Sequence, residues 1–271
     1  MSPRVVVTAG ASGIGREIVR AFVANGAKVF VCDIDGKGLQ LLAQELPGLT
    51  TKICDISKRE DVERMVAFGV DALGGLDVLV NNAGISGPTA PVEEMNPDEW
   101  EKVMQVDLTG TFNVTRLAIP HLKKSQAGVI INMSSVAGRF GYANRSPYCT
   151  AKWGLIGFTK TLSIELGEHG IRANAILPGA VDGPRIQRVF EGRAKASGQP
   201  LEEIKKQAMA VQSLKRFVDP RDIAALAVSL ASDAAKSISG QMLPIDNDRL
   251  ATGSKNSSIV ISITIPFLQR Q

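Results

Sequence analysis

The start of the chain places a glycine-rich turn between a short apolar run and an amphipathic helix pattern, in the sequence RVVVTAGASGIGREIV. Residues 5–8 read as a buried strand, and apolar residues from Ile14 to Phe22 recur at helical spacing until Gly26 ends the helix. Between them, the glycines of residues 10–15 let the backbone come close to a ligand, and N–H groups at the helix N-terminus can bind phosphate oxygens. This order predicts the opening strand and helix of an α/β domain that binds a dinucleotide.

A second apolar strand, KVFVCDID, follows this helix and ends at Asp33, eighteen residues after Gly15. An acid at this place accepts hydrogen bonds from both ribose hydroxyls of an adenosine and repels a 2′-phosphate. We therefore expect NAD as the cofactor, with NADH preferred over NADPH. Taken alone, the glycine turn also fits an ordinary tight turn, but Asp33 in register favours the dinucleotide site.

A candidate catalytic pair lies in SSVAGRFGYANRSPYCTAKWG, where Tyr148 and Lys152 are four residues apart and Ser135 precedes the tyrosine by thirteen. On a helix, residues i and i+4 project from one face. The lysine ammonium then stabilises a tyrosine phenolate, which exchanges a proton with a substrate oxygen near neutral pH. Ser135 is placed to hold that oxygen by a hydrogen bond. Alone, the pair also fits a surface tyrosine beside a solvated lysine.

From about Arg4 to Asp246 the chain resembles the short-chain dehydrogenase/reductase family. The matching motifs stand in the family's order, and they are TAGASGIG at 8–15, Asp55 in ICDIS, NNAG at 81–84, the residues Ser135, Tyr148 and Lys152, and Pro178-Gly179. The resemblance implies one doubly wound Rossmann-type α/β domain. Its seven-stranded parallel sheet would have the order 3-2-1-4-5-6-7, with helices on both faces and the cofactor across the carboxyl ends of the strands.

The resemblance also implies which residues perform the chemistry. As phenolate, Tyr148 takes the hydroxyl proton while hydride passes from the carbinol carbon to the nicotinamide, and ketone reduction is the reverse. Ser135 holds the oxygen, Lys152 also binds the nicotinamide ribose, and Asp107, at a position where the family usually has asparagine, completes the predicted catalytic set. The predicted cofactor-binding residues are Gly10, Ser12, Gly13, Ile14, Gly15, Asp33, Asp55, Ile56, Asn82, Ala83, Gly84, Tyr148, Lys152, Pro178, Gly179 and Val181.

Three residues depart from the family pattern. Ala9 replaces the glycine after the threonine, and because Gly10 follows, we expect the bend to be kept. Asp107 replaces an asparagine that helps to hold a water between the lysine and solvent. A carboxylate near Lys152 offsets part of the ammonium's field, so we expect Asp107 to raise the pH optimum for oxidation, unless it is a tolerated near-isostere. Gly183 replaces a threonine near the nicotinamide amide, which removes a hydroxyl contact and loosens the hinge.

The segment 183–217 is expected to cover the active site as a helical lid and to determine the substrate, as this region does in the family. Arg185 and Arg188 follow the Pro-Gly strand end closely and are placed to hold a carboxylate, phosphate or sulfonate group. The alternative is that they face solvent or pair with Glu191. Two further residues predicted to line the pocket are Tyr142 and Arg145.

We therefore predict an NAD(H)-dependent oxidoreductase that interconverts a secondary alcohol and a ketone, with a small-molecule substrate. Small polyols, sugars and hydroxy acids are one substrate class. The alternative within the enzyme class is a β-ketoacyl thioester reductase that uses NADPH. The alternative outside it is a non-catalytic dinucleotide-binding relative, which the presence of Ser135, Tyr148 and Lys152 disfavours.

Composition and charge exclude several other classes. The chain has 271 residues, 44% of them hydrophobic, and a net charge of +4 without a basic cluster, so no nucleic-acid partner is expected. Three cysteines and two histidines follow no metal-ligand spacing, so no metal site is expected, and Cys32 and Cys54 read as small buried residues. No signal peptide or membrane-spanning run is recognised, which predicts a cytoplasmic protein without a membrane partner. By the resemblance, we expect a homotetramer or homodimer.

The remaining predictions concern domain bounds and helices. Residues 1–250 are expected to form the single domain, and 251–271 a tail that is disordered or non-native, pairs as an edge strand or reaches a neighbouring subunit. A long helix is predicted from Asn96, its N-cap, to about Lys124, kinked or shortened near its end by Pro120. Further helices are predicted over about 58–75, over 147–167, which carries the candidate pair, and after the N-cap Asp219.

Overall fold

The computed structural model of the protein describes residues 2–248, and its centre is a parallel sheet of seven strands. The strands are β1 (Arg4–Thr8), β2 (Lys28–Asp33), β3 (Thr50–Ile53), β4 (Val78–Asn81), β5 (Val129–Met133), β6 (Arg172–Pro178) and β7 (Met242–Ile245). Their order is β3-β2-β1-β4-β5-β6-β7, which confirms the predicted topology. The predicted tail, 251–271, lies outside the described residues.

The central strands are rich in β-branched and other apolar residues because helices cover both faces of the sheet. Residues 5–7 of β1 are at most 4% exposed, and Val6 pairs in register with Phe30 of β2 and Leu79 of β4. All strand pairs are parallel, so the carboxyl ends of the strands meet at one edge of the sheet. The motifs of the predicted site follow these ends.

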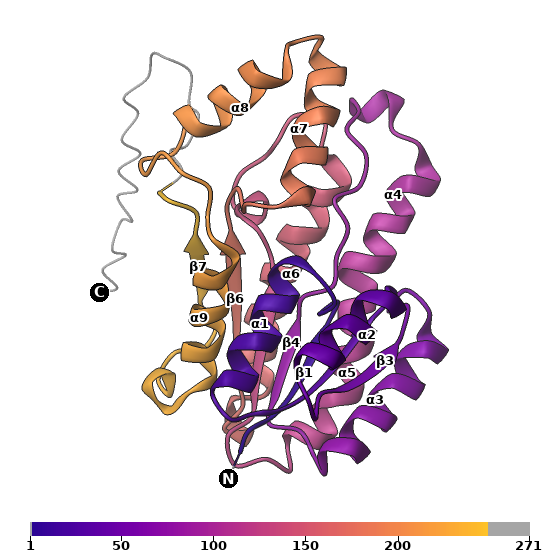
Figure 1. The fold of residues 1–271 in the computed structure, drawn as a ribbon, viewed down its shortest axis with the longest axis vertical. Helices are drawn as coiled ribbons and strands as arrows, with labels where there is room; N and C mark the ends of the chain where they lie inside the picture. Colours follow the sequence, from indigo (N-terminus) through magenta and orange to yellow (C-terminus); the bar gives the residue numbers. More distant parts are fainter. Residues whose placement is uncertain (1, 249–271) are drawn as a thin grey trace, which may run out of the picture.

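Two helical layers enclose the sheet (Figure 1). One layer consists of α1 (Gly13–Ala24), α2 (Gly36–Glu45) and α9 (Pro220–Ala231), and its core includes Ile18, Leu39 and Ile223. The other consists of α3 (Arg59–Leu73), α5 (Thr111–Leu122) and α6 (Ser146–Glu165), and its core includes Val62, Val114 and Leu162. Asp219 caps α9 by accepting a hydrogen bond from the Arg221 N–H, as predicted. Short 3-10 turns cover Val92–Glu94, Val136–Gly138, Gly167–His169 and Asp233–Ala235.

The segment predicted as one long helix is divided into three parts. It consists of α4 (Pro97–Met104), a π-helical stretch (Gln105–Gly110) and α5, and Asn96 caps its start as predicted. Pro120 is accommodated inside α5, which ends two residues later at Leu122. A π-helical stretch inserts a residue and rotates the side chains within it, and such stretches occur frequently at functional sites. This stretch carries Asp107.

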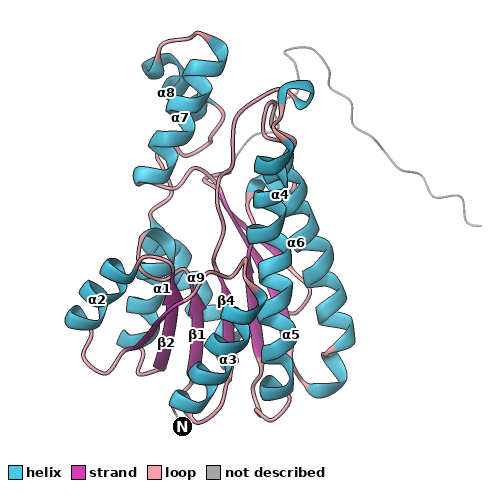
Figure 2. Ribbon diagram, turned by 90° about the vertical axis from the view of Figure 1, so that its right-hand side faces the viewer, coloured by secondary structure: helices cyan, strands magenta, loops and turns pink. Residues whose placement is uncertain are grey.

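The segment 183–217 contains α7 (Pro184–Ser197) and α8 (Leu201–Ala210), which stand beyond the carboxyl ends of the strands (Figure 2). These helices have a small core of their own around the buried residues Phe190, Ile204 and Ala208. The Phe190 ring packs against that of Phe217 with centroids 5.9 Å apart. Within residues 2–248, no helix is long and apolar enough to cross a membrane.

Candidate active site

A cleft of about 1450 Å³ lies at the carboxyl ends of the strands, bordered by the glycine turn, the start of α6 and the segment 183–217. Every residue predicted to bind cofactor or substrate lines it, with the exception of Gly10. Ser135 lines it too, whereas Asp107 is fully buried and does not reach it. The fold therefore gathers the predicted residues around one cavity.

The glycine turn offers backbone N–H groups to this cleft. Helix α1 begins at Gly13, and the Ser12 side chain caps none of its N–H groups, so the first turn of the helix can bind an anion such as a phosphate. A Cβ on Gly15 would lie 2.1 Å from the Ala9 carbonyl oxygen, so only glycine fits there. Gly10 does not line the cleft but is buried against β2. A Cβ at this position would lie 2.2 Å from the Val31 side chain, so glycine is needed there too.

The bend of this turn is kept in an unexpected way. Ala9 itself takes the left-handed backbone conformation, with φ of 53°, which costs a residue with a Cβ more than it costs glycine. Asn82, after β4, holds the bend by donating side-chain hydrogen bonds to the carbonyls of Thr8 at 3.1 Å and Ala9 at 2.9 Å. The Thr8 hydroxyl accepts the N–H groups of Asn82 and Ala83, both at 3.0 Å. This linking role of the motif threonine was missed from the sequence.

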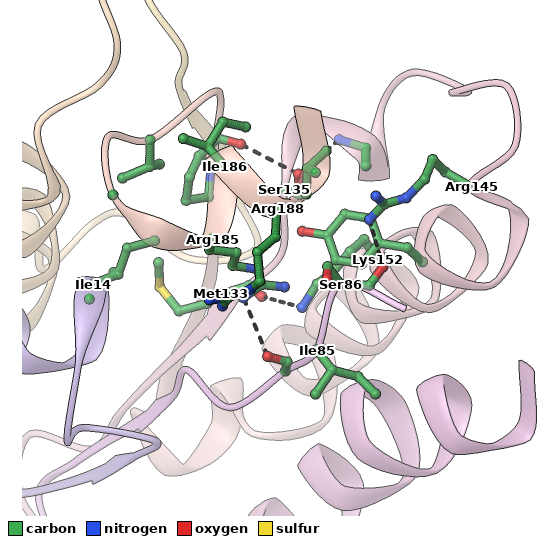
Figure 3. Close-up of a pocket in the computed structure, with 18 of the residues that line it drawn as sticks. Ile14, Ile85, Ser86, Met133, Ser135, Arg145, Lys152, Arg185, Ile186 and Arg188 are labelled. Carbon is green, nitrogen blue, oxygen red and sulfur yellow. Dashed lines mark hydrogen bonds between the residues drawn. The ribbon is translucent and has the colours of Figure 1, made fainter. Parts of the chain in front are cut away.

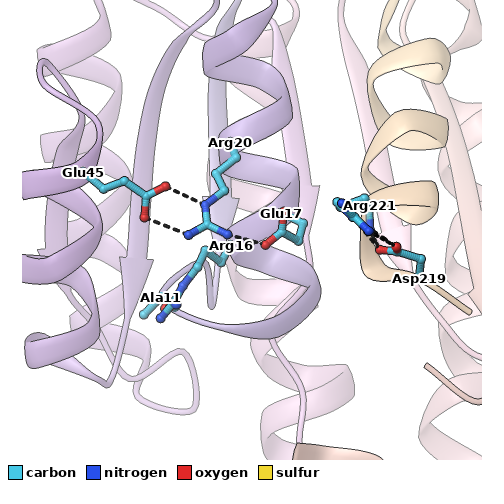
Figure 4. A network of polar contacts seen from close by, with 7 residues as sticks. All are labelled: Ala11, Arg16, Glu17, Arg20, Glu45, Asp219 and Arg221. Atoms are coloured by element: carbon cyan, nitrogen blue, oxygen red, sulfur yellow. Dashed lines mark hydrogen bonds and ion pairs between the residues drawn. The ribbon is translucent and has the colours of Figure 1, made fainter. Parts of the chain in front are cut away.

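Arginines on α1 reinforce the same region (Figure 4). Arg16 donates from Nε and Nη2 to the Ala11 carbonyl, at 2.9 and 2.6 Å, which fixes the turn from the helix side. Arg20 pairs with Glu17 and, across to α2, with Glu45 at 2.7 Å. The hydrogen bonds to Glu45 raise the pKa of Arg20 and lower that of Glu45.

Asp33 ends β2 with its carboxylate beside the cleft. Oδ2 accepts the Ala11 N–H at 2.9 Å, and Oδ1 accepts the Asp35 N–H at 3.0 Å. A carboxylate has about four acceptor positions, so both oxygens retain capacity for ribose hydroxyls. Asp33 therefore fits its predicted contact and also steadies the glycine turn.

The next strand end contributes Asp55, whose Oδ1 accepts hydrogen bonds from the N–H and hydroxyl of Ser57 at 3.0 and 2.7 Å.

Cys32 and Cys54 are buried and unbridged below this part of the cleft, in agreement with their predicted packing role. A hydrogen bond between their side chains, together with burial, raises the pKa of Cys32, and the same bond lowers that of Cys54.

Ser135 lies just beyond β5 and is 9% exposed. Its Oγ accepts the Ala137 N–H at 3.1 Å and lies 3.4 Å from the Pro178 carbonyl oxygen, so the hydroxyl is held at the strand ends. The preceding residue, Ser134, donates to the Lys152 carbonyl at 2.8 Å and ties β5 to α6. Sequence reasoning did not single out Ser134, although its place beside Ser135 in the SS pair was a visible signal.

Lys152 is 3% exposed and donates to the Met133 carbonyl at 3.2 Å. Its Nζ also lies 3.2 Å from Oδ2 of Asp107, while Oδ1 of Asp107 accepts the Ile85 N–H at 2.7 Å. A Cβ on Gly84 would lie within 3.1 Å of both charged groups, so glycine leaves space for the ion pair. The π-helical stretch thus places Asp107 directly behind the lysine.

Cations surround the ring of Tyr148. Lys152 Nζ lies 5.6 Å from the ring centroid, and the guanidinium carbons of Arg145 and Arg185 lie at 5.2 and 5.8 Å. Figure 3 shows Arg185 and Arg188 extending from α7 toward the part of the cleft that holds Ser135 and Lys152. Three cationic groups therefore lie within 6 Å of the centroid of this one ring.

Gly183, the third departure from the family pattern, immediately precedes α7 as its N-cap and has a φ of 139°, a conformation that residues other than glycine rarely adopt. The backbone at this position therefore requires glycine, and a threonine would be strained there.

Among residues 2–248, no group of three or more His, Cys, Asp or Glu side chains is placed to hold a metal ion.

Comparison with known proteins places these residues in a wider context. The family model described as enoyl-(acyl carrier protein) reductase matches residues 8–247. An L-fucose dehydrogenase of Bos taurus is 37% identical over 93% of this chain and 91% of its own length. A D-beta-hydroxybutyrate dehydrogenase of Cupriavidus necator is 37% identical over 91% of this chain and 97% of its own.

Among solved structures, a variant of an actinorhodin polyketide ketoreductase with NADPH is similar, with a TM-score of 0.86 and 33% sequence identity. The superposition covers 91% of this chain and 96% of the ketoreductase. The likeness therefore extends over the described domain rather than over one motif.

Proposed function

Because the chain belongs to the short-chain dehydrogenase/reductase family, we propose that it is an NAD(H)-dependent oxidoreductase that interconverts a secondary alcohol and a ketone, with Tyr148 as acid and base. Its relatives are oxidoreductases that act on CH–OH groups or reduce the corresponding ketones. The single observation that carries the proposal is that Ser135, Tyr148 and Lys152 line the same cleft as the glycine turn and Asp33.

The side chains present fit a nicotinamide dinucleotide. The uncapped N-terminus of α1 suits the pyrophosphate, and Asp33 suits the adenosine ribose. Gly84 leaves room at the strand ends beside Lys152. The bound cofactor supplies hydride acceptor and donor chemistry at the carbon of the substrate. NADH is proposed over NADPH because the Asp33 carboxylate would repel a 2′-phosphate.

The protein's own residues handle the proton and the oxygen. The Ser135 hydroxyl donates a hydrogen bond to the substrate oxygen, and Tyr148 takes the hydroxyl proton during oxidation and returns it during reduction. The ammonium of Lys152 stabilises the phenolate, and Asp107 offsets part of its charge. The Met133 carbonyl orients the lysine from the sheet side.

A second candidate is reduction of β-ketoacyl thioesters with NADPH. The family model's description and the polyketide ketoreductase with NADPH favour it. Asp33 opposes it, because the same carboxylate that suits NADH disfavours the 2′-phosphate of NADPH. The cofactor therefore separates the two candidates.

The test is a nicotinamide absorbance assay. Purified protein is given NAD+ with a panel of secondary alcohols, including sugars, polyols and hydroxy acids, and NADH with the matching ketones. We expect NADH to form with at least one alcohol and to be consumed by its ketone. Turnover of β-ketoacyl thioesters with NADPH alone would move the assignment to the second candidate. NADH binding without any turnover would indicate a non-catalytic dinucleotide-binding protein.

A further inference from the structure

The substrate end of the cleft concentrates positive charge. Arg145, at the start of α6, and Arg185 and Arg188, on α7, all line it, and two of the three guanidinium groups lie within 6 Å of the Tyr148 ring centroid. Four carboxylates line the cleft. Asp33, Asp35 and Asp55 lie at its other end, where β2 and β3 end, and Asp182 lies on the α7 side.

These arginines differ from Lys152 in having no ion-pair partner among residues 2–248. Lys152 is paired with Asp107, whereas no carboxylate of residues 2–248 lies within 4.0 Å of Arg145, Arg185 or Arg188. Arg185 has a hydrogen bond of 3.3 Å to the Gly84 carbonyl, which is neutral. The local charge is therefore uncompensated by the described protein.

Arg145 makes the strongest case, because it is only 7% exposed. It donates to the Ser86 carbonyl at 2.6 Å and weakly to Thr89, while its Nε is buried without an acceptor among the described residues. Burial lowers the pKa of Arg145, and although Tyr148 acts to raise it, Arg185 lowers it further. A buried cation without a counter-ion is costly, and an anion bound nearby would offset that cost.

The cofactor's pyrophosphate is an alternative source of the missing charge. The N-terminus of α1, with Ser12 and Gly13, already offers N–H groups for that purpose at the glycine turn. Arg145 lies elsewhere in the cleft, next to the proposed proton donor on α6. This placement favours a charge on the substrate.

We propose that the natural substrate carries an anionic group, a carboxylate, sulfonate or phosphate, that Arg185 and Arg188 bind near Tyr148 while buried Arg145 supplies supporting positive charge. The inference rests on the proposed function and narrows it from alcohols in general to hydroxy acids and their analogues. Guanidinium groups suit it because they bind such planar or multi-oxygen anions through paired N–H donors. Neutral sugars would leave the three charges uncompensated.

The test measures binding without turnover, by calorimetric titration of ketones into the protein saturated with NAD+, where no hydride is available to reduce them. The probes are acetoacetate, acetonylsulfonate and acetonylphosphonate, with methyl acetoacetate as the neutral comparison. At least one anion is expected to bind about tenfold more tightly than the ester, as a charge-assisted hydrogen bond predicts. The three anions distinguish the carboxylate, sulfonate and phosphate classes.

Variants locate the effect. R185Q and R188Q should each reduce the affinity of the preferred anion about tenfold, and the affinities of the ester and of NADH by clearly less. The matched control is R216Q, which removes an exposed arginine that does not line the cleft and should change nothing. The proposal is overturned if the ester binds as tightly as every anion, or if R185Q and R188Q weaken NADH as much as the anion.

Turnover separates this proposal from the proposed function. Reduction of methyl acetoacetate by NADH without anion preference would support the oxidoreductase and overturn the anionic substrate. Anion binding that depends on Arg188, without reduction of any ketone in the panel, would support the anion site and count against the oxidoreductase.

Discussion

The ammonium of Lys152 lies 3.2 Å from a carboxylate oxygen of Asp107, and the two side chains are only 4% and 0% exposed. The same oxygen has no hydrogen-bond partner of suitable geometry among the described residues, whereas the other accepts the Ile85 N–H. The contact is therefore chiefly electrostatic. It places a negative charge immediately behind the residue that is proposed to stabilise the Tyr148 phenolate.

Asp107→Asn should lower the pH optimum for alcohol oxidation by about one pH unit. Asparagine keeps an acceptor for the Ile85 N–H but removes the carboxylate charge beside Lys152, so the positive field of the ammonium is offset less. The measurement is the pH profile of kcat/KM for oxidation. Asp98→Asn, an equal charge change at an exposed site on α4, is the control, and an unchanged profile for Asp107→Asn would contradict the assigned role.

Asp33→Ala should remove the preference for NADH over NADPH. The carboxylate is proposed to accept two ribose hydroxyls, so its loss should weaken NADH binding about tenfold or more and weaken NADPH binding less. Because Asp33 also accepts the Ala11 N–H, Asp33→Asn serves as a control that keeps an acceptor for the turn. Fluorescence titration with both cofactors is the measurement, and equal affinities in the wild-type protein would refute the ribose assignment.

Ala9→Gly should stabilise the fold, because Ala9 holds the left-handed conformation that glycine adopts without strain. The expected gain in the free energy of unfolding is about 0.5–1 kcal/mol, since the greater freedom of glycine in the unfolded chain offsets part of the relief. Urea unfolding measures it. The same substitution at exposed Ala225, inside α9, should have the opposite sign. Destabilisation by both variants would contradict the strained turn.

The pair of Arg4 and Asp77 should make stability depend on acid pH. Their side chains lie 2.7 Å apart, and although burial acts to raise the pKa of Asp77, hydrogen bonds from Arg4 and Ser125 lower it to about 2. A pKa depressed in the folded state stabilises the fold above the unfolded value of about 4, and this contribution is lost as pH falls toward the folded value.

Asp77→Asn should accordingly reduce the free energy of unfolding by about 1–2 kcal/mol at neutral pH, after allowance for partial exposure. The difference from wild type should narrow as pH is lowered from about 5 to about 2. Urea unfolding across this pH range measures the free energy of unfolding of both proteins. The control is Asp71→Asn, which makes the same charge change at an exposed position. If the difference in the free energy of unfolding between Asp77→Asn and wild type does not vary with pH, the lost stability comes from altered packing and not from the charge of Asp77.

Much of the fold follows from local patterns in the sequence. The apolar strands and their order, the caps Asn96 and Asp219 and the helix that carries Tyr148 and Lys152 were all predictable, because each depends on neighbours in sequence or on the family's topology. The positions of the predicted site residues around one cleft follow from the same parallel order.

Other features depend on contacts between distant segments. The π-helical stretch at Asp107 accommodates Lys152 and Ile85, which lie on α6 and after β4, so helical periodicity alone could not reveal it. Gly10 was predicted to keep the bend, but Val31 on the neighbouring strand β2 fills the space where a Cβ of residue 10 would lie, and Ala9 takes the strained conformation.

The most direct test of the account is Tyr148→Phe, measured for NADH binding and for turnover of the same alcohol in parallel. The variant keeps the ring among its cations but has no hydroxyl to exchange a proton. We expect NADH affinity to fall by no more than about tenfold, as the loss of one hydrogen bond allows, and kcat to fall by about a hundredfold to ten-thousandfold. A variant that binds NADH normally and retains a substantial part of the wild-type kcat would contradict Tyr148 as the acid and base.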